Sequence, residues 1–310
     1  MKIAYIFPGQ GSQYVGMAKE LIENNAASKA VFDSASAVLG YDLAQLCIHG
    51  PAEKLNRTEN TQPAILAASI AVLAALEQKG VKAEAAAGHS LGEYTAITAA
   101  GGFDLKDAVG LVQKRGRYMQ EAVPEGAGLM AAILGMERAA VEKTCLEASK
   151  NGIVAPANYN SPGQIVIAGE RKAVEAAMAL ARAGGAKKVV PLAVSVPSHC
   201  SMMKDAGEKL AKELDRVPLR DLRFPIVNNA DAKFLRTAAE LKPSLLRQIS
   251  SSLFWEDSID RMTAEGFDTF IEVGPGRVLS GLVKRIAKDA KVLNVEDLKS
   301  LTETLAALGK

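Results

Sequence analysis

A serine between two glycines is the residue of this sequence best suited to nucleophilic chemistry. It lies in Gly88-His89-Ser90-Leu91-Gly92, after a predicted strand at 82–87 that is rich in alanine and before a helical pattern at 93–100. A sharp turn from strand to helix lifts a serine hydroxyl clear of the sheet, and flanking glycines leave room for neighbouring backbone. The same spacing also occurs in ordinary glycine- and serine-rich loops, so the pattern predicts a nucleophile elbow whose chemistry depends on its partners.

A serine hydroxyl needs a neighbouring base, usually a histidine, to take up its proton. The sequence has three histidines. His89 adjoins Ser90 and its side chain is expected to point away from the hydroxyl, while His49 lies in a predicted turn before Pro51. His199 lies in a loop of small residues that can approach another loop closely. By elimination, His199 is the predicted base.

A third group usually holds such a histidine in the correct tautomer. Three carboxylates are candidates by residue type, although none lies in a telling motif: Asp205, Asp257 and Glu272. A backbone carbonyl can do the same by accepting the other ring N–H. The residues alone leave these two alternatives open.

Acyl transfer also needs two backbone amides that stabilise the negative charge on the attacked carbonyl oxygen. One is the amide of the residue after the nucleophile, Leu91, and the other usually comes from a loop after an early strand. The loop Gly9-Gln10-Gly11 follows a predicted strand at 2–7. It is suited to supply the second amide through Gln10, and it has neither glycine pattern of a nucleotide-phosphate site.

Composition excludes several other classes of protein. The 310 residues carry a net charge of +2 with acids and bases interspersed, so there is no basic stripe of the kind that binds nucleic acid. Three scattered cysteines, Cys47, Cys145 and Cys200, favour reduced thiols over disulfides or a zinc site. The apolar run at 64–76 is shorter than a membrane span and predicts a core helix. We therefore expect a cytoplasmic protein without a metal, a cofactor, a nucleic-acid partner or a membrane segment.

The order of the predicted elements indicates an α/β fold with two parts. Residues 125–194 predict a β-α-β-β-α-β order, with strands at 128–134, 153–159, 164–168 and 187–194 and helices at 137–149 and 172–183. This is the ferredoxin-like pattern, which we interpret as a small inserted subdomain. Residues 1–124 and 195–310 form the larger part. Its predicted strands lie at 2–7, 82–87, 226–228, 269–273 and 292–294, and its helices at 18–24, 30–39, 42–47, 64–76, 93–100, 105–119, 205–214, 244–254, 278–286 and 298–308.

The helix predicted at 105–119 carries several basic residues, which usually face solvent. Arg115 and Met119 are four residues apart and share one face, while Arg117 points elsewhere. Arg115 is therefore a candidate for an inward-facing cation.

Several segments, taken together and in order, resemble the malonyl-CoA:acyl carrier protein transacylases of fatty acid synthesis, which are related to polyketide synthase acyltransferase domains. The resemblance covers essentially the whole chain and implies an α/β-hydrolase-like large domain with a mostly parallel sheet. The segments that carry it are 7–13, 88–93, 113–116, 158–164, 196–199 and 272–276.

The resemblance implies a role for individual residues. Ser90 would carry the acyl group, His199 would be its base, and the main-chain carbonyl of Gln248 would steady that histidine. Gln10 and Leu91 would form the oxyanion hole. Four further residues would bind substrate, with the first pairing with the malonyl carboxylate: Arg115, Met119, Asn158 and Ser198. Ser198 is shorter than the residue that many malonyl-selective polyketide acyltransferases carry there, so this position does not establish selectivity.

The implied reaction is transfer of malonyl from malonyl-CoA to the phosphopantetheine thiol of acyl carrier protein through a malonyl ester on Ser90. A monomer is expected, with carrier protein docking on bases such as Lys187, Lys188 or Arg117. Three alternatives stay open: a trans-acting acyltransferase of a polyketide pathway, a serine acyl hydrolase or thioesterase, and a non-catalytic docking module for carrier protein.

Overall fold

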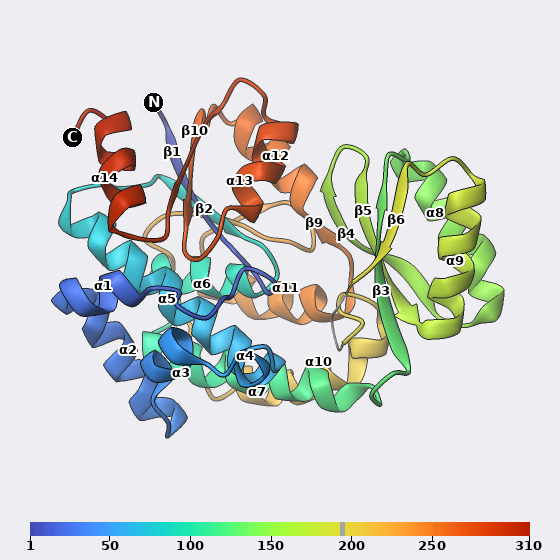
Figure 1. The fold of residues 1–310 in the computed structure, drawn as a ribbon, viewed down its shortest axis with the longest axis horizontal. Coiled ribbons are helices and arrows are strands. Elements are labelled where there is room, and N and C mark those ends of the chain that lie inside the picture. The colour runs from blue at the N-terminus through green and yellow to red at the C-terminus, as the bar shows by residue number, and fades with distance from the viewer. Residues whose placement is uncertain (193–195) are drawn as a thin grey trace.

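The larger of the two sheets lies at the centre of the larger part of the molecule. A computed structural model describes residues 1–192 and 196–310, and in it this sheet has the strand order β11-β10-β1-β2-β7-β8 (Figure 1). The first five of these strands are parallel, and β8 is antiparallel to β7. The strands are β1 (Ile3–Phe7), β2 (Ala85–Gly88), β7 (Ile226–Val227), β8 (Phe234–Leu235), β10 (Thr269–Val273) and β11 (Lys291–Val295).

Helices cover both faces of this sheet, which explains why β1 and β2 are apolar along their whole length. Tyr5 and Phe7 face a core built with α5, α6 and α7, whereas Ala4 and Ile6 face the core of α12 and α13. The helices are α1 (Lys19–Asn24), α2 (Ala26–Leu39), α3 (Leu43–His49), α4 (Ala52–Leu55), α5 (Thr58–Gln78), α6 (Leu91–Ala99), α7 (Leu105–Ala122), α10 (Lys204–Leu214), α11 (Ala238–Ser250), α12 (Trp255–Ala264), α13 (Val278–Ile286) and α14 (Leu298–Ala307), with a short 3₁₀ turn, η2 (Ser201–Met203), before α10.

Helix α5 is the core helix of the large part. It is longer than predicted because it begins at Thr58 and continues through Pro63, where the sequence suggested a start. Its length and apolar composition suffice for a membrane span, but 83% of its most apolar window is buried inside the fold. It packs against α2, α6 and α7, so its apolar residues are accounted for by the protein core.

The second sheet has the order β6-β3-β5-β4-β9 and lies beside the first (Figure 1). Its first four strands are antiparallel, and with two helices on one face they follow the ferredoxin-like order β3-α8-β4-β5-α9-β6. The elements are β3 (Gly128–Leu134), α8 (Arg138–Ala148), η1 (Ser149–Asn151), β4 (Val154–Ser161), β5 (Gln164–Glu170), α9 (Arg171–Ala183) and β6 (Lys188–Pro191). The domain limits at 124/125 and 194/195 stay a prediction, and residues 194 and 195 lie outside the described residues.

Several short elements differ from the predictions. Phe254 was predicted at the end of a helix, but it lies in β9 (Leu253–Phe254), which pairs with β4 of the second sheet. Helix α11 begins at Ala238, before Pro243, and the ten-residue helix α12, which follows β9 directly, was not predicted. Helix α4 and strand β8 were not predicted either. A two-residue strand or a four-residue helix is too short to give a hydrophobic period. His49 is the last residue of α3 and not part of a turn.

Candidate active site

Ser90 lies at the strand-to-helix turn between β2 and α6, as the sequence predicts. Its φ of 53° is in the left-handed region that residues other than glycine rarely adopt. A Cβ at Gly88 would come within 1.9 Å of the Gly92 carbonyl, and a Cβ at Gly92 within 2.0 Å of the Phe7 carbonyl oxygen. Both glycines are therefore required, because strand β2, helix α6 and strand β1 approach one another through them.

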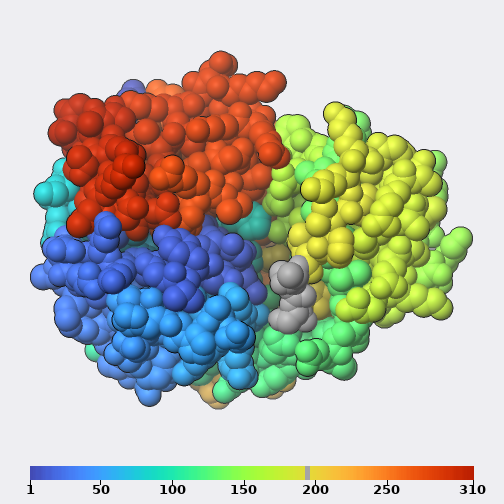
Figure 2. All heavy atoms as spheres, viewed as in Figure 1, coloured from blue at the N-terminus to red at the C-terminus, as the bar shows by residue number. Residues whose placement is uncertain are grey.

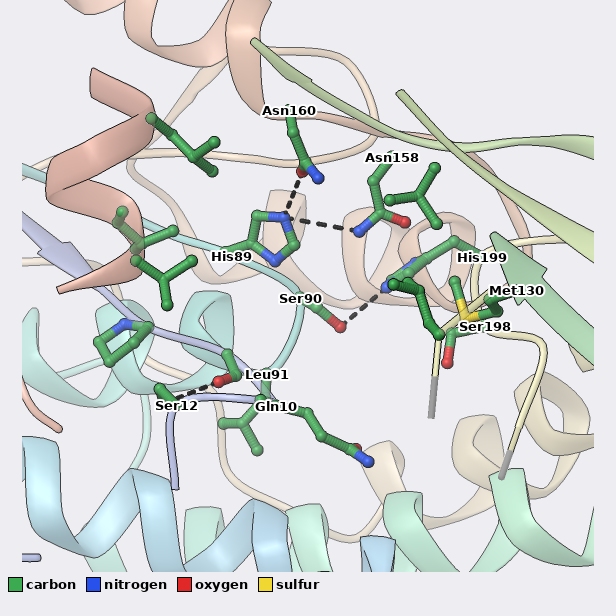
Figure 3. Close-up of a pocket in the computed structure, with 18 of the residues that line it drawn as sticks. Gln10, Ser12, His89, Ser90, Leu91, Met130, Asn158, Asn160, Ser198 and His199 are labelled. Carbon is green, nitrogen blue, oxygen red and sulfur yellow. Dashed lines mark hydrogen bonds between the residues drawn. The ribbon is translucent and has the colours of Figure 1, made fainter. Parts of the chain in front are cut away.

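His199 is within hydrogen-bond distance of Ser90 (Figure 3). Its Nε2 lies 2.8 Å from Ser90 Oγ, and its Nδ1 lies 2.8 Å from the main-chain oxygen of Gln248. The carbonyl can only accept, so Nδ1 donates to it and Nε2 accepts from the serine hydroxyl. Burial and the positive charge of Arg115 lower the pKa of His199 to about 3, which keeps the ring neutral. The pair thus has the geometry of a nucleophile and its base.

The three carboxylates considered from the sequence lie elsewhere. Asp257 pairs with Arg138 at 3.0 Å, and Glu272 accepts hydrogen bonds from the first amides of α13. Asp205 is exposed on α10. Of the two alternatives for the partner of the histidine, the structure thus contains the backbone carbonyl, on Gln248.

Arg115 is buried on α7, with 1% of its surface exposed. Its Nη1 donates to Gln62 Oε1 at 2.8 Å, and its Nη2 donates to Ser90 Oγ at 3.2 Å and to Gln248 Oε1 at 3.1 Å. The guanidinium also lies over the ring of Tyr94. Among the ion pairs of the described residues none includes Arg115, and its Nε has no partner there. A buried cation held only by neutral groups favours an anionic ligand.

Gln10 and Leu91, the residues predicted to supply the two amides, line the same cavity as Ser90. Leu91 begins α6, so its amide is one of the first-turn amides that have no acceptor within the helix. The loop with Gln10 packs tightly on the elbow, since a Cβ at Gly9 would lie 2.3 Å from the His89 carbonyl oxygen. The Gln10 side chain donates away from the site, to Thr58 Oγ1 at 3.3 Å. Gln10 is one of the residues that line the pocket.

A cavity of about 230 Å³ opens at Ser90 between the two parts of the molecule. In Figure 2 the parts meet along a crevice in the visible face. The remaining predicted substrate residues, Met119, Asn158 and Ser198, all line the cavity. So do apolar side chains of the second sheet, including Met130 and Val166. The cavity combines an apolar wall with a few polar groups around the serine, which is typical of a small-molecule site.

His89 does not contact the serine hydroxyl. Its ring points to Asn160 and packs edge-on against Trp255, with Nε2 donating to Asn160 Oδ1 at 2.8 Å (Figure 3). Burial lowers the pKa of His89. The prediction that this side chain points away from Ser90 is confirmed by these contacts.

Sequence reasoning missed three residues that hold the site together. Asn229 accepts a hydrogen bond from the Ser90 amide at 2.8 Å and donates to the Gly88 carbonyl at 2.7 Å. Gln62 holds Arg115, and Asn160 holds His89. A signal existed for Asn229, because it follows β7, the neighbour of β2 in a parallel sheet, and the carboxyl ends of such strands meet at one edge.

Comparisons with known proteins agree with the geometry. The acyl transferase domain family matches residues 4–303. The malonyl CoA-acyl carrier protein transacylase of Escherichia coli K12 is 50% identical over 92% of this chain and 93% of its own length. The enzyme of the same name from Bacillus subtilis is 46% identical over 99% and 97% of the two chains.

Solved structures give the same result. An acyl carrier protein S-malonyltransferase from Vibrio cholerae has a TM-score of 0.96 at 47% identity and covers 98% of this chain and 100% of its own. A malonyl-transacylase in complex with a type II polyketide synthase acyl-carrier protein has a TM-score of 0.97 at 45% identity, with 99% and 100% covered. The chain therefore belongs to the acyl transferase domain family, among the malonyl CoA-acyl carrier protein transacylases.

Proposed function

We propose that this acyltransferase moves a malonyl group from malonyl-CoA to the phosphopantetheine thiol of an acyl carrier protein, through a malonyl ester on Ser90. One observation carries the proposal: Ser90 Oγ lies 2.8 Å from the His199 ring nitrogen and 3.2 Å from a guanidinium nitrogen of Arg115. A nucleophile and its base thus adjoin a buried cation that can pair with a free carboxylate on the acyl group.

In the first half of the reaction, His199 Nε2 takes the Ser90 proton while Oγ attacks the thioester carbonyl. The amides of Gln10 and Leu91 donate to the oxygen that becomes negative. The carbon–sulfur bond then breaks, and coenzyme A leaves as a thiol with the proton that His199 held. The product is a malonyl ester on Ser90.

The second half reverses these roles. His199 takes the proton of the phosphopantetheine thiol, and the sulfur attacks the ester carbonyl. The bond between the carbonyl carbon and Ser90 Oγ breaks, and Oγ regains the proton from His199. Only groups of this chain and the two substrates are used. The relative that was solved with an acyl-carrier protein supports this class of acceptor.

Arg115 separates malonyl from acetyl substrates in this scheme. An uncharged acyl group would leave the buried guanidinium without a charged partner, which disfavours its binding. Met119, Asn158 and Ser198 form the walls around the acyl chain and its thioester, in keeping with their place in the cavity. Supply of extender units for fatty acid synthesis is the proposed pathway, and a polyketide pathway is the alternative. A cytoplasmic location is supported by the cysteines, which are all unpaired and buried.

Intact-protein mass spectrometry tests the proposal. The wild type is mixed with malonyl-CoA, methylmalonyl-CoA or acetyl-CoA, and holo carrier protein is added afterwards. We expect the mass of one malonyl group on the wild type, none on Ser90→Ala, and transfer of that mass to the carrier protein. A label that persists on Ser90→Ala would contradict the ester. Release of malonyl to water as fast without carrier protein as with it would identify a hydrolase.

A further inference from the structure

The Gln248 side chain lies between two buried groups of opposite charge. Its Nε2 donates to Glu93 Oε2 at 2.9 Å, and its Oε1 accepts from Arg115 Nη2 at 3.1 Å. Glu93 and Gln248 have no exposed surface, and Arg115 has 1%. A side-chain amide has one donating end and one accepting end, so it can satisfy both neighbours in only one orientation.

The carboxylate of Glu93 is the charged acceptor that strengthens that orientation. If the amide turned over, its oxygen would face the carboxylate and its NH₂ group would face the guanidinium. One buried contact would then place two acceptors together, and the other would place two donors together. Such unpaired buried groups are costly. The Ser90 carbonyl and Arg115 favour the same orientation, so a neutral side chain at position 93 would weaken the restraint on the amide by removing its charged acceptor.

The same carboxylate also reaches the backbone of the nucleophile. Glu93 Oε2 accepts from the main-chain N–H of Asn229 at 3.0 Å, and the Asn229 side-chain oxygen accepts from the main-chain N–H of Ser90 at 2.8 Å. Gln248 Nε2 donates in addition to the Ser90 carbonyl at 2.9 Å. Glu93 therefore touches neither the cavity nor the Ser90 hydroxyl, but it contacts the two residues that hold the elbow in place.

Gln248 also keeps the two charges apart. With the amide between them, Glu93 does not form an ion pair with Arg115, so the guanidinium keeps donors for a ligand carboxylate. Its Nε has no partner among the described residues. Burial lowers the pKa of Arg115, and the interactions with Tyr94 and with the negative charge of Glu93 oppose that shift. This arrangement suits a cation that must stay buried and yet be available to substrate.

We propose that Glu93 is a positioning residue that acts through Gln248 to hold the Arg115 guanidinium where the malonyl carboxylate binds. The inference rests on the proposed function, because its effect is defined by the preference for malonyl over acetyl groups. It assigns to Glu93 a part in substrate selection beyond packing beneath the elbow.

The first test compares Glu93→Gln with the wild type in the acylation of Ser90. The values of kcat/KM are measured separately with malonyl-CoA and with acetyl-CoA. We expect the malonyl value to fall about 10-fold to 100-fold relative to the acetyl value, the effect of weakening a hydrogen bond to a charged group. Glu272→Gln is the matched control, since Glu272 is equally buried and, within the part of the chain that the structure describes, accepts from the first amides of α13. It should leave the malonyl-to-acetyl ratio unchanged.

A double-mutant cycle with Arg115→Ala separates positioning from a general structural defect. If Glu93 acts through the guanidinium, Glu93→Gln will change the ratio little once Arg115 has been removed. Equal slowing of both substrates by Glu93→Gln, or additive effects on the ratio, would overturn the proposal. A wild type that takes malonyl on Ser90 and passes it to holo carrier protein shows that the proposed function holds in either case. A wild type without that ester would instead refute the proposed function.

The wild type alone provides a second test if Glu93→Gln does not fold. Burial raises the pKa of Glu93 to about 7, although the contacts with Asn229 and Gln248 and the charge of Arg115 lower it. The other titratable groups near this network are Tyr94, next to Glu93 on α6, His89, adjacent to Ser90 in the sequence, and His199, whose Nδ1 donates to the Gln248 carbonyl. Protonation below pH 7 should release Gln248, so the malonyl-to-acetyl ratio should fall as the pH falls from about 8 to about 6. A ratio independent of pH would contradict the proposal.

Discussion

Ser90 and His199 face each other across 2.8 Å, and the backbone of both residues has a positive φ, at 53° and 60°. Such conformations cost about 1–3 kcal/mol each and persist only where the surroundings enforce them. At Ser90 the enforcing contacts are the hydrogen bonds of its amide to Asn229 and of its carbonyl to Gln248. The main-chain carbonyl of Gln248 also accepts a hydrogen bond from His199 Nδ1. One residue of α11 thus braces both halves of the reacting pair.

Removal of the base should slow acylation without abolishing the site. We expect His199→Ala to lower the rate of Ser90 acylation by malonyl-CoA about 10²-fold to 10⁴-fold, the range for loss of a general base. Rapid-quench mass spectrometry measures the rate directly. His49→Ala, at the exposed end of α3, is the control and should acylate at the wild-type rate. A His199→Ala rate within a few-fold of the wild type would exclude His199 as the base.

Arg115 should control the choice of acyl group. Arg115→Ala should cost about 2–5 kcal/mol in kcat/KM for malonyl-CoA, the usual effect of truncating one member of a buried charge pair. The acetyl-CoA value should change much less. Arg117→Ala is a matched control on the same helix, because Arg117 is exposed and contacts Glu121. An equal loss for malonyl-CoA and acetyl-CoA would show that Arg115 does not bind the carboxylate.

The residues that the sequence identified are those whose chemistry is local or scarce. The elbow could be predicted because Gly88, Ser90 and Gly92 lie within five residues, and His199 because the chain has few histidines. The oxygen that accepts from His199 could not be derived from spacing, since any backbone carbonyl can serve, and Gln248 came only from the family resemblance.

The buried network behind the elbow was beyond prediction for a different reason. Glu93 bonds to residues 136 and 155 positions away along the chain, and a single sequence gives no measure of such pairings. The fold shows the same limit. Elements with a clear hydrophobic period, such as β3 and α13, were predicted with the observed bounds. The two-residue strand β9, which joins the two parts of the molecule, was assigned to a helix.

Glu93 should also make the stability of the protein depend on pH. Its pKa is raised from 4.5 to about 7 in the folded protein, so between these values the folded state binds more protons than the unfolded state. The contribution of Glu93 to the free energy of unfolding therefore falls as the pH rises through this window, by up to about 3 kcal/mol. The Glu93→Gln variant lacks this pH-dependent contribution, because its side chain does not titrate. In urea unfolding of both proteins at pH 4.5 to 8, the variant should gain stability relative to the wild type as the pH rises. A difference in unfolding free energy that is the same at every pH would contradict the prediction.

Carrier protein should depend on exposed bases that malonyl-CoA does not need. Lys187 and Lys188 are exposed at the start of β6, the edge strand of the second sheet, and Arg117 is exposed on α7. If an acidic carrier protein docks there, Lys188→Glu should slow transfer from malonyl-Ser90 to carrier protein several-fold at low salt, with less effect at high salt. Acylation by malonyl-CoA should be unchanged. An unaltered transfer rate at low salt for charge reversal at all three positions would place the docking surface elsewhere.

The elbow should tolerate no side chain at its second glycine. A Cβ at Gly92 would lie 2.0 Å from the carbonyl oxygen of Phe7, in the central strand β1, where neither backbone can move without disturbing the sheet. We expect Gly92→Ala to lose about 3 kcal/mol or more in urea unfolding. Gly281→Ala in α13 is the opposite case, since nothing lies within 4 Å of its added Cβ. It should gain up to about 1 kcal/mol from the better helix propensity of alanine. If both variants unfolded at the wild-type urea concentration, the close approach of α6 to β1 would not be needed to hold Ser90.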